Sequence, residues 1–263
     1  MYSFGFIGCG NMGGTLAVAV SKTQKDIALA DRSEETVKKI AEITGGSAVS
    51  NEDICKDAKY IVLGVKPQVL PSVLKEIKPI LKKRKDRFVI ISMAAGVAIE
   101  TITEELGKVP VIRIMPNTPA QIGEGMIVYS INGLVTDEEK SEFINAFSSA
   151  GEICEIPQNL IDGASAISGC GPAFVYMFID ALADGGVRCG LPRDLALKLA
   201  AKTVSGSADT VIKTNKHPCE LKDAVCSPAG STIEGVQSLE KDRFKGTVTD
   251  AVSASFKRTK ELG

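Results

Sequence analysis

The sequence predicts an α/β domain with a doubly wound, mostly parallel sheet, followed by an all-helical domain. Two observations lead to this prediction. Up to about residue 157, short apolar runs rich in β-branched residues alternate with helical segments, which is typical of parallel strands joined by helical crossovers. After Pro157 the strand pattern stops and only helical segments follow. We therefore expect a first domain over residues 1–157 and a second domain over residues 158–263.

The expected strands are short apolar runs, and those that are continuously apolar have the pattern of strands buried on both faces. They cover 3–8, 26–31, 60–65, 88–93, 109–116, 125–130 and 152–157. Helices are expected at 11–22, 33–44, from Asn51 onward, and near 137–149. In the second domain they are expected at 171–187, 191–213, 217–226, 231–241 and 246–262. The loops that follow the strands then lie at the carboxyl edge of the sheet, where such sheets bind ligands.

Composition excludes several classes of partner. The chain has 263 residues, a net charge of −1, no Trp and only 5% aromatic residues, so neither a basic surface nor stacking platforms for nucleic acid are expected. Its seven cysteines are scattered and form no C-x-x-C pair, and no metal-ligand spacing is present. No secretory signal and no apolar run of membrane-spanning length is apparent. We expect a soluble cytoplasmic protein without metal, nucleic-acid or membrane partners.

The turn after the first expected strand carries the first functional motif. Gly8-Cys9-Gly10-Asn11-Met12-Gly13 fits G-x-G-x-x-G, and it follows a strand and opens a helix, which is the context this motif requires. The first glycine permits the tight turn, the second lets a pyrophosphate approach the backbone, and the third allows close helix–strand packing. This context favours a Rossmann-type dinucleotide site over a purely structural glycine turn.

The end of the second strand gives conflicting signals about which dinucleotide binds. Asp31 occupies the position where an acid holds the ribose hydroxyls of NAD. Arg32 and Ser33 follow it directly and would suit the 2′-phosphate of NADP, although Arg32 could equally be a solvated surface charge. We expect NADPH to be preferred, with NAD(H) as the alternative.

Three further turns lie at the same expected edge of the sheet. Residues 64–67 include Lys66, which could meet a phosphate or carboxylate or simply be exposed, and residues 93–96 contain Ala94, Ala95 and Gly96. These three are small enough for a flat nicotinamide ring to lie against the backbone. Residues 115–120 form a rigid loop between two prolines.

The helical half contains an apolar helix and an interrupted one. The segment 171–187 is apolar on nearly every side, so another subunit is expected to cover it. The lone His217 precedes a proline at a helix start and is more often structural than catalytic in such a place. In "VCSPAGSTIEG" (225–235), Pro228 and Gly230 break the helix and Ser231 or Thr232 is a natural N-cap. This is either a plain turn or an anion site at a helix N-terminus.

Motifs along the whole chain resemble those of the pyrroline-5-carboxylate reductase family. The strings "GFIGCGNMG", "VKP", "MAAGV", "RIMPNTPA", "LIDGASAISGCGPAF", "DALADGGVRCGLPR" and "HPCELKDAVCSPAGSTIEGVQSLE" occur in the family's order and spacing. The last is the most specific, although Ala229 stands where the family usually has glycine. Either this position does not need a positive φ, or it tolerates alanine at some cost.

The resemblance implies an activity, a site and an assembly. The implied activity is NAD(P)H-dependent reduction of the imine Δ1-pyrroline-5-carboxylate to L-proline, the last step of proline biosynthesis. It places Ser227, Gly230, Ser231 and Thr232 at the substrate carboxylate, with Thr232 also at the ring nitrogen as the catalytic residue. The implied cofactor residues are Ile7, Gly8, Cys9, Gly10, Asn11, Met12, Gly13, Arg32, Ser33, Asn51, Val65, Lys66, Pro67, Ala94, Ala95 and Gly96. The implied assembly is a homodimer with interlocking helical domains, or a larger homo-oligomer such as a decamer.

Two other functions remain open from the sequence. A β-hydroxyacid dehydrogenase-like oxidoreductase would share the nucleotide-binding half. It would need a catalytic Lys or His in the helical half, and it would not have the 227–232 loop. A non-catalytic nucleotide-sensing protein would not need Gly8, Gly10, Gly13 and Thr232 all to be intact.

Overall fold

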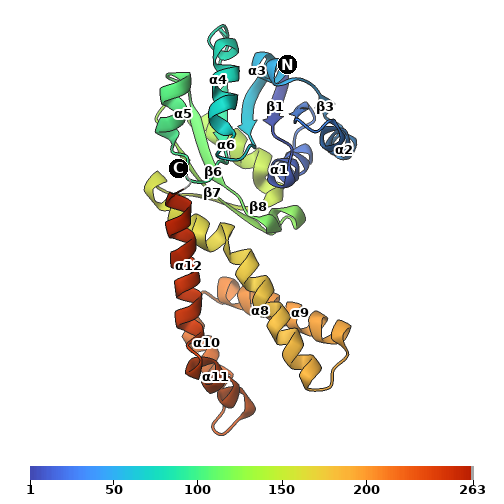
Figure 1. The fold of residues 1–263 in the computed structure, drawn as a ribbon, viewed down its shortest axis with the longest axis vertical. Helices are drawn as coiled ribbons and strands as arrows, with labels where there is room; N and C mark the ends of the chain where they lie inside the picture. The colour runs from blue at the N-terminus through green and yellow to red at the C-terminus, as the bar shows by residue number, and fades with distance from the viewer. Residues whose placement is uncertain (262–263) are drawn as a thin grey trace. The chain divides into compact units, whose positions relative to one another are not determined.

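The computed structural model describes residues 1–261, and the chain divides into two compact units. The first unit comprises Met1–Cys170 together with the end of the chain from Ser255, and the second comprises Gly171–Ala254. The two units are shown in Figure 1 and are described separately below.

The first unit is built on an eight-stranded sheet in the order β3-β2-β1-β4-β5-β6-β7-β8. All neighbouring strands pair in parallel except β6 and β7, which are antiparallel. The strands are β1 Tyr2–Ile7, β2 Ile27–Ala30, β3 Ser47–Ala48, β4 Ala58–Leu63, β5 Val89–Ser92, β6 Val111–Met115, β7 Gly125–Ile131 and β8 Gly151–Glu155. Only the short 3-10 helix η1 (Thr118–Ile122) joins β6 to β7, too little chain for a parallel crossover.

Helices cover both faces of this sheet. The helices are α1 Asn11–Ser21, α2 Glu34–Thr44, α3 Asn51–Asp57, α4 Leu70–Leu81, α5 Ile99–Leu106 and α6 Asp137–Phe147. Leu16 of α1, Val37 of α2 and Phe143 of α6 are buried in one core cluster with one face of the strands. Ile77 of α4 and Ile102 of α5 are buried in a second cluster with the opposite face. This is the doubly wound arrangement that the alternating pattern predicted, and the predicted fold class is confirmed.

The helix boundaries follow local sequence signals where a cap is present. Ser33 accepts a hydrogen bond from the Thr36 N–H and starts α2, while Ser50 and Thr136 each form a capping box at the start of α3 and α6. Helices α4 and α5 were not predicted from the sequence. The N-cap residues of both helices make no side-chain cap hydrogen bond, and α4 also contains Pro79, so the cap signals are absent there. The spacing of the buried residues, as in Leu70, Val73 and Ile77 of α4, is nevertheless that of an amphipathic helix.

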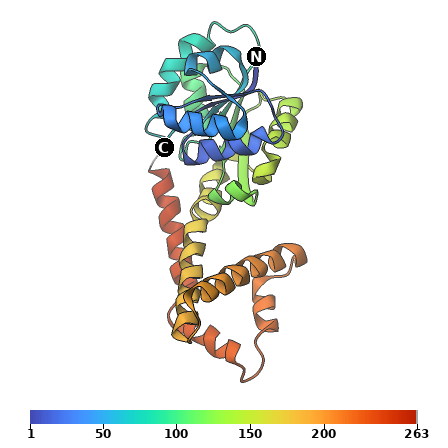
Figure 2. The ribbon, with the colours of Figure 1, turned by 90° about the vertical axis from the view of Figure 1, so that its right-hand side faces the viewer.

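The second unit consists only of helices. They are α8 Gly171–Arg188, α9 Arg193–Thr214, α10 Pro218–Ala224, α11 Ser231–Lys241 and the first part of α12 Phe244–Lys260. Figure 2 shows that they are spread out rather than gathered in a bundle. Only three hydrophobic side chains of this unit are buried, Ala183 of α8 with Ala196 and Ala200 of α9. The chain alone therefore does not bury α8, whose sequence is apolar on nearly every side.

One helical stretch corrects an expectation from the sequence. Residues Gln158–Arg188 form a helical run that is long and apolar enough to cross a membrane by length and composition alone. The expectation that no run reaches this length was wrong, because α8 is preceded without a break by α7 (Ile161–Ala164) and the π-helix η4 (Ser165–Gly169). Core helices of soluble proteins can have the same length and apolar composition.

Candidate active site

The glycine turn between β1 and α1 is packed so closely that three glycines admit no side chain. A Cβ on Gly13 would lie 2.0 Å from the Gly8 carbonyl oxygen, and one on Gly64 would lie 2.3 Å from the same atom. Gly8 itself has φ +98°, in the region that favours glycine. These contacts bring the start of α1 against the ends of β1 and β4.

Gly10 is different, because a Cβ there would meet no protein atom within 4 Å. The protein's own packing does not require glycine at this position, but an approaching ligand would. Gly10 is also the N-cap of α1, and no side chain accepts from the first N–H groups of that helix. Unpaired N–H groups at the positive end of an eleven-residue helix are suited to phosphate. The turn thus fits the pyrophosphate of a dinucleotide.

A cavity of about 590 Å³ opens beside this turn. It is lined by seven of the residues predicted to bind the cofactor: Ile7, Gly8, Gly10, Arg32, Asn51, Val65 and Lys66. These residues come from the ends of β1, β2 and β4 and from the start of α3, which is the carboxyl edge of the sheet. The structure therefore brings together, in one cavity, residues that are far apart in the sequence.

The same cavity is lined by seven residues that were not singled out from the sequence: Ala30, Val49, Ser50, Val69, Ser72, Val73 and Glu76. Glu76 of α4 accepts a hydrogen bond from the Asn51 side-chain amide at 3.0 Å. Several of these residues are on α4, which was not predicted, so the sequence gave no reason to place them near Asn51.

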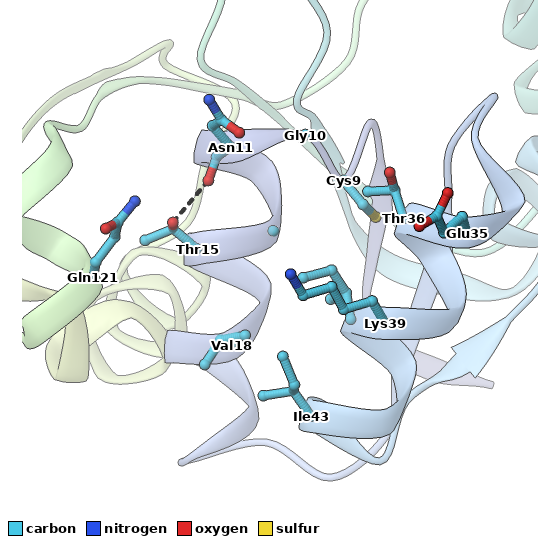
Figure 3. A pocket seen from close by; sticks show the side chains of 12 residues that line it. Cys9, Gly10, Asn11, Thr15, Val18, Glu35, Thr36, Lys39, Ile43 and Gln121 are labelled. Atoms are coloured by element: carbon cyan, nitrogen blue, oxygen red, sulfur yellow. Dashed lines mark hydrogen bonds between the residues drawn. The ribbon is translucent and has the colours of Figure 1, made fainter.

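Two predicted cofactor residues lie on the other side of the glycine turn. Cys9 and Asn11 line a second cavity of about 680 Å³ between α1 and α2, which Figure 3 shows with Gln121 at its rim. The Cys9 side chain is buried, and burial followed by the nearby Asp31 charge raises the pKa of its thiol to about 12. Cys9 is therefore not a nucleophile at neutral pH.

The remaining predicted cofactor residues line neither of these two cavities. They are Met12, Gly13, Ser33, Pro67, Ala94, Ala95 and Gly96. The Ser33 hydroxyl accepts from the Thr36 N–H at 3.2 Å as the cap of α2. Ala94 is buried, and Gly96 has φ +76° in the turn after β5.

The loop before α11 forms the candidate substrate site in the second unit. The N-cap of α11 is Gly230, not Ser231 or Thr232 as the sequence analysis expected, and no side chain caps this helix. The Gly230 N–H donates to the Ser227 carbonyl at 3.0 Å. A Cβ on Gly230 would lie 2.3 Å from the Ser227 Oγ, so the hydroxyl of Ser227 sits directly against this glycine. The Ser231 and Thr232 N–H groups begin an eleven-residue helix without a side-chain acceptor, which suits an anion.

The backbone conformation of Ala229 shows whether this position, where the family usually has glycine, needs a positive φ. Its φ is +54°, so the position adopts the left-handed conformation and alanine is tolerated at a cost. For residues other than glycine, this conformation costs about 1–2 kcal/mol.

We expect Ala229→Gly to stabilise the protein. The substitution removes the backbone strain, and part of the gain is lost to the greater freedom of glycine in the unfolded chain, which leaves about 0.5–1 kcal/mol. Calorimetry should show a rise in Tm of about 1–4 °C. Ala208→Gly in α9, at a position of ordinary helical conformation, is the matched control and should lower Tm. If both substitutions lowered Tm, the strain at Ala229 would be refuted.

The single histidine has a structural contact. His217 is the N-cap of α10, and its Nδ1 accepts from the Cys219 N–H at 3.2 Å. Within residues 1–261, no group of three or more His, Cys, Asp or Glu side chains is arranged to hold a metal ion. The first unit thus holds a candidate dinucleotide site at the glycine turn and its cavity. The second unit holds its own candidate anion site at the uncapped start of α11.

Comparison with known proteins bears on both units. Residues 158–262 match the family model described as pyrroline-5-carboxylate reductase dimerisation, and residues 3–96 match one described as NADP oxidoreductase, coenzyme F420-dependent. The pyrroline-5-carboxylate reductase of Pisum sativum is 40% identical over 99% of this chain and 96% of its own length. That of Escherichia coli K12 is 38% identical over 98% of this chain and 97% of its own.

The chain belongs to the pyrroline-5-carboxylate reductase family. The resemblance of its motifs to this family is thereby confirmed.

Solved structures agree with this membership. The pyrroline carboxylate reductase of Plasmodium falciparum, determined with NADP bound, has a TM-score of 0.87 and 36% identity, and the match covers 100% of this chain and 98% of that one. Prephenate dehydrogenase from Aquifex aeolicus has a TM-score of 0.52 at 13% identity over 93% of this chain and 98% of its own. The latter likeness concerns the fold alone.

Proposed function

We propose that this member of the pyrroline-5-carboxylate reductase family reduces Δ1-pyrroline-5-carboxylate to L-proline, with NADPH as the preferred reductant. The observation that carries this proposal is the uncapped N-terminus of α11, where Ser227 and Thr232 stand beside amides without a side-chain acceptor. Such a site suits a small substrate with a carboxylate next to a basic ring nitrogen.

The proposed roles of the loop residues follow from the donors that remain available. Because the Gly230 N–H donates to the Ser227 carbonyl, the carboxylate is held by the Ser227 hydroxyl and by the Ser231 and Thr232 N–H groups. Gly230 contributes by leaving room for the Ser227 side chain. The Thr232 hydroxyl donates to the ring nitrogen and keeps the imine oriented.

In the proposed reaction, the protein mainly orients the substrate and stabilises the charge that develops on it. The bound dinucleotide supplies a hydride to the imine carbon. Thr232 Oγ stabilises the ring nitrogen as its electron density rises, and either this hydroxyl or water provides the proton. The single histidine is engaged as a helix cap, which supports a mechanism without a histidine acid.

The proposed cofactor site follows the geometry of the first unit. The Gly8–Gly13 turn receives the pyrophosphate, Arg32 and Ser33 lie at the adenosine ribose, and Asn51, Val65 and Lys66 line the cavity beside it. Pro67 is placed with this group by the family motif, and the turn 94–96 is proposed for the nicotinamide end. The match to a solved relative with NADP bound supports this assignment.

The experiment that tests the proposed function follows NADPH or NADH oxidation at 340 nm. Turnover is expected with Δ1-pyrroline-5-carboxylate and not with hydroxy or keto acids. Oxidation with a keto acid and none with the imine would favour a β-hydroxyacid dehydrogenase-like activity. Binding of a dinucleotide without turnover of either substrate would favour a nucleotide-sensing role.

Arg32→Ala should reveal which dinucleotide the site prefers. Arg32 is exposed at the rim of the cavity, so its guanidinium is free to meet a 2′-phosphate. Losing a hydrogen-bonded charge pair should raise KM for NADPH by about 10-fold or more, with a smaller change for NADH. Lys38→Ala, which removes an exposed cation from α2, is the control and should change neither KM. Equal effects of Arg32→Ala on both KM values would show that Arg32 does not contact the phosphate.

The exposed apolar surface of the second unit supports a homo-oligomer. Val175, Tyr176 and Met177 of α8 and Ile212 of α9 are 42%, 57%, 73% and 73% exposed in the single chain. The match of residues 158–262 to a dimerisation model fits a second copy as the cover for this surface. We propose a homodimer that can build larger rings such as a decamer, in the cytoplasm and without nucleic-acid or membrane partners. In this proposal, residues 1–157 bind the dinucleotide, and residues 158–263 bind substrate and dimerise.

A further inference from the structure

The carboxylate of Asp31 at the end of β2 connects two segments that frame the cofactor cavity. Its Oδ2 accepts a hydrogen bond from the Cys9 N–H at 2.8 Å, across 22 residues of sequence. Its Oδ1 accepts from the Ser33 N–H at 3.0 Å. One side chain therefore joins the glycine turn to the residue that caps α2.

The glycine turn depends on this acceptor. Cys9 is 1% exposed, so its N–H has little access to water and would be left unpaired if Asp31 were removed. An unpaired buried N–H is strongly unfavourable. The neighbouring Gly8 N–H is already paired with the Ala30 carbonyl at 2.8 Å, so Asp31 completes the pairing along this part of the turn.

The second hydrogen bond acts on α2. Ser33 is the N-cap of this helix, and its hydroxyl accepts from the Thr36 N–H. By holding the Ser33 backbone, Asp31 also fixes the path of Arg32, which lies between them in the chain and lines the cavity.

We propose that Asp31 is a positioning residue that holds the glycine turn and the Arg32–Ser33 segment in the geometry that binds either dinucleotide. It is neither a selective ligand of the NAD ribose nor a barrier to the 2′-phosphate of NADP. Each of its oxygens already accepts a backbone N–H, one from Cys9 and one from Ser33, so the carboxylate is held by the protein's own backbone. This inference rests on the proposed function, because it concerns how the proposed cofactor binds.

The test compares Asp31→Asn with Asp26→Asn in the intact protein. Asparagine offers one acceptor oxygen and turns an NH₂ group toward the other N–H donor, so one of the two hydrogen bonds is lost. Asp26→Asn makes the same charge change at an exposed position just before β2 and is the matched control. Calorimetric titration gives Kd for NADPH and NADH, and the melting of the cofactor-free protein gives Tm.

For Asp31→Asn we expect Kd to rise by about 10-fold for NADPH and by a similar factor for NADH. The Tm of the cofactor-free protein should fall by about 2–4 °C, with no such change for Asp26→Asn. Asp31→Glu keeps the charge and both acceptors on a longer side chain and is the second variant should Asp31→Asn fail to fold. It should weaken the binding of both dinucleotides equally, by a smaller factor.

Three results would overturn the inference. A rise in Kd for NADH alone would make Asp31 a ribose ligand, and a fall in Kd for NADPH would make it a barrier to the 2′-phosphate. Unchanged Kd and Tm would show that the two hydrogen bonds have no positioning role. If the unaltered protein bound neither dinucleotide, the proposed function would fail and the inference with it, whereas failure of the inference alone leaves wild-type binding intact.

Discussion

Met177→Glu is expected to convert the protein into a folded but inactive monomer. Met177 is 73% exposed on α8 in the single chain, so a carboxylate there remains hydrated in the monomer and does not disturb its core. In the proposed dimer the same carboxylate would be buried without a partner, which costs several kcal/mol and weakens association by about 100-fold or more. Activity should fall as association is lost, because the second unit carries the proposed substrate loop and buries few apolar side chains of its own.

Sedimentation equilibrium and circular dichroism together check this result. The variant should sediment as a monomer at assay concentrations and keep its helical signal, while Met177→Leu, which preserves the apolar contact, should remain associated and active. A Met177→Glu protein that stays dimeric and active would place the interface elsewhere. Flotation of the unaltered protein with lipid vesicles would show instead that lipid covers α8.

Thr232→Ala is expected to lower kcat by about 10- to 100-fold, the worth of one hydrogen bond to a charged or developing centre. The N-cap of α11 is Gly230 and no side chain caps this helix, so loss of the Thr232 hydroxyl should leave Tm unchanged. The amides proposed to hold the carboxylate stay in place, so KM for the imine should change little. Steady-state kinetics with saturating NADPH measures both constants.

Two companion variants separate orientation from binding. Thr232→Ser keeps the hydroxyl and should retain most of the wild-type kcat. Ser227→Ala removes the proposed carboxylate contact, which would be made equally in the ground and transition states, so it should mainly raise KM. Wild-type kcat and KM in Thr232→Ala would show that the threonine has no part in the reaction, and the loop would then be only a turn between helices.

The glycine turn and all the strands except the short, exposed β3 were predictable because their signals are local. A buried parallel strand is visible as a continuous apolar run, and Gly8, Gly10 and Gly13 lie within six residues of each other. Asp31 was not predictable in the same way. Its position suggested a ribose ligand, but its hydrogen bond to the Cys9 N–H joins residues far apart in sequence and exists only in the folded chain.

The loop before α11, the candidate substrate site, was also only partly predictable from the sequence. The hydroxyl residues Ser231 and Thr232 suggested a side-chain cap, yet the backbone turns earlier and Gly230 takes that position. Sequence alone also left two explanations for Ala229, and only its φ of +54° decided between them. Backbone angles at a turn depend on how the flanking helices enter it, which is set by tertiary packing.

Few side chains are buried in the second unit, so the stability of the protein should depend on its concentration. With only Ala183, Ala196 and Ala200 buried in the single chain, this unit gains further apolar burial when another copy binds, so association adds to its stability by mass action. The temperature of unfolding should then rise with protein concentration, and dilution should act as a mild denaturant. A newly made chain would expose apolar helices until it associates with a second copy. Slow synthesis keeps the number of copies low and prolongs this exposure, which would favour aggregation or proteolysis.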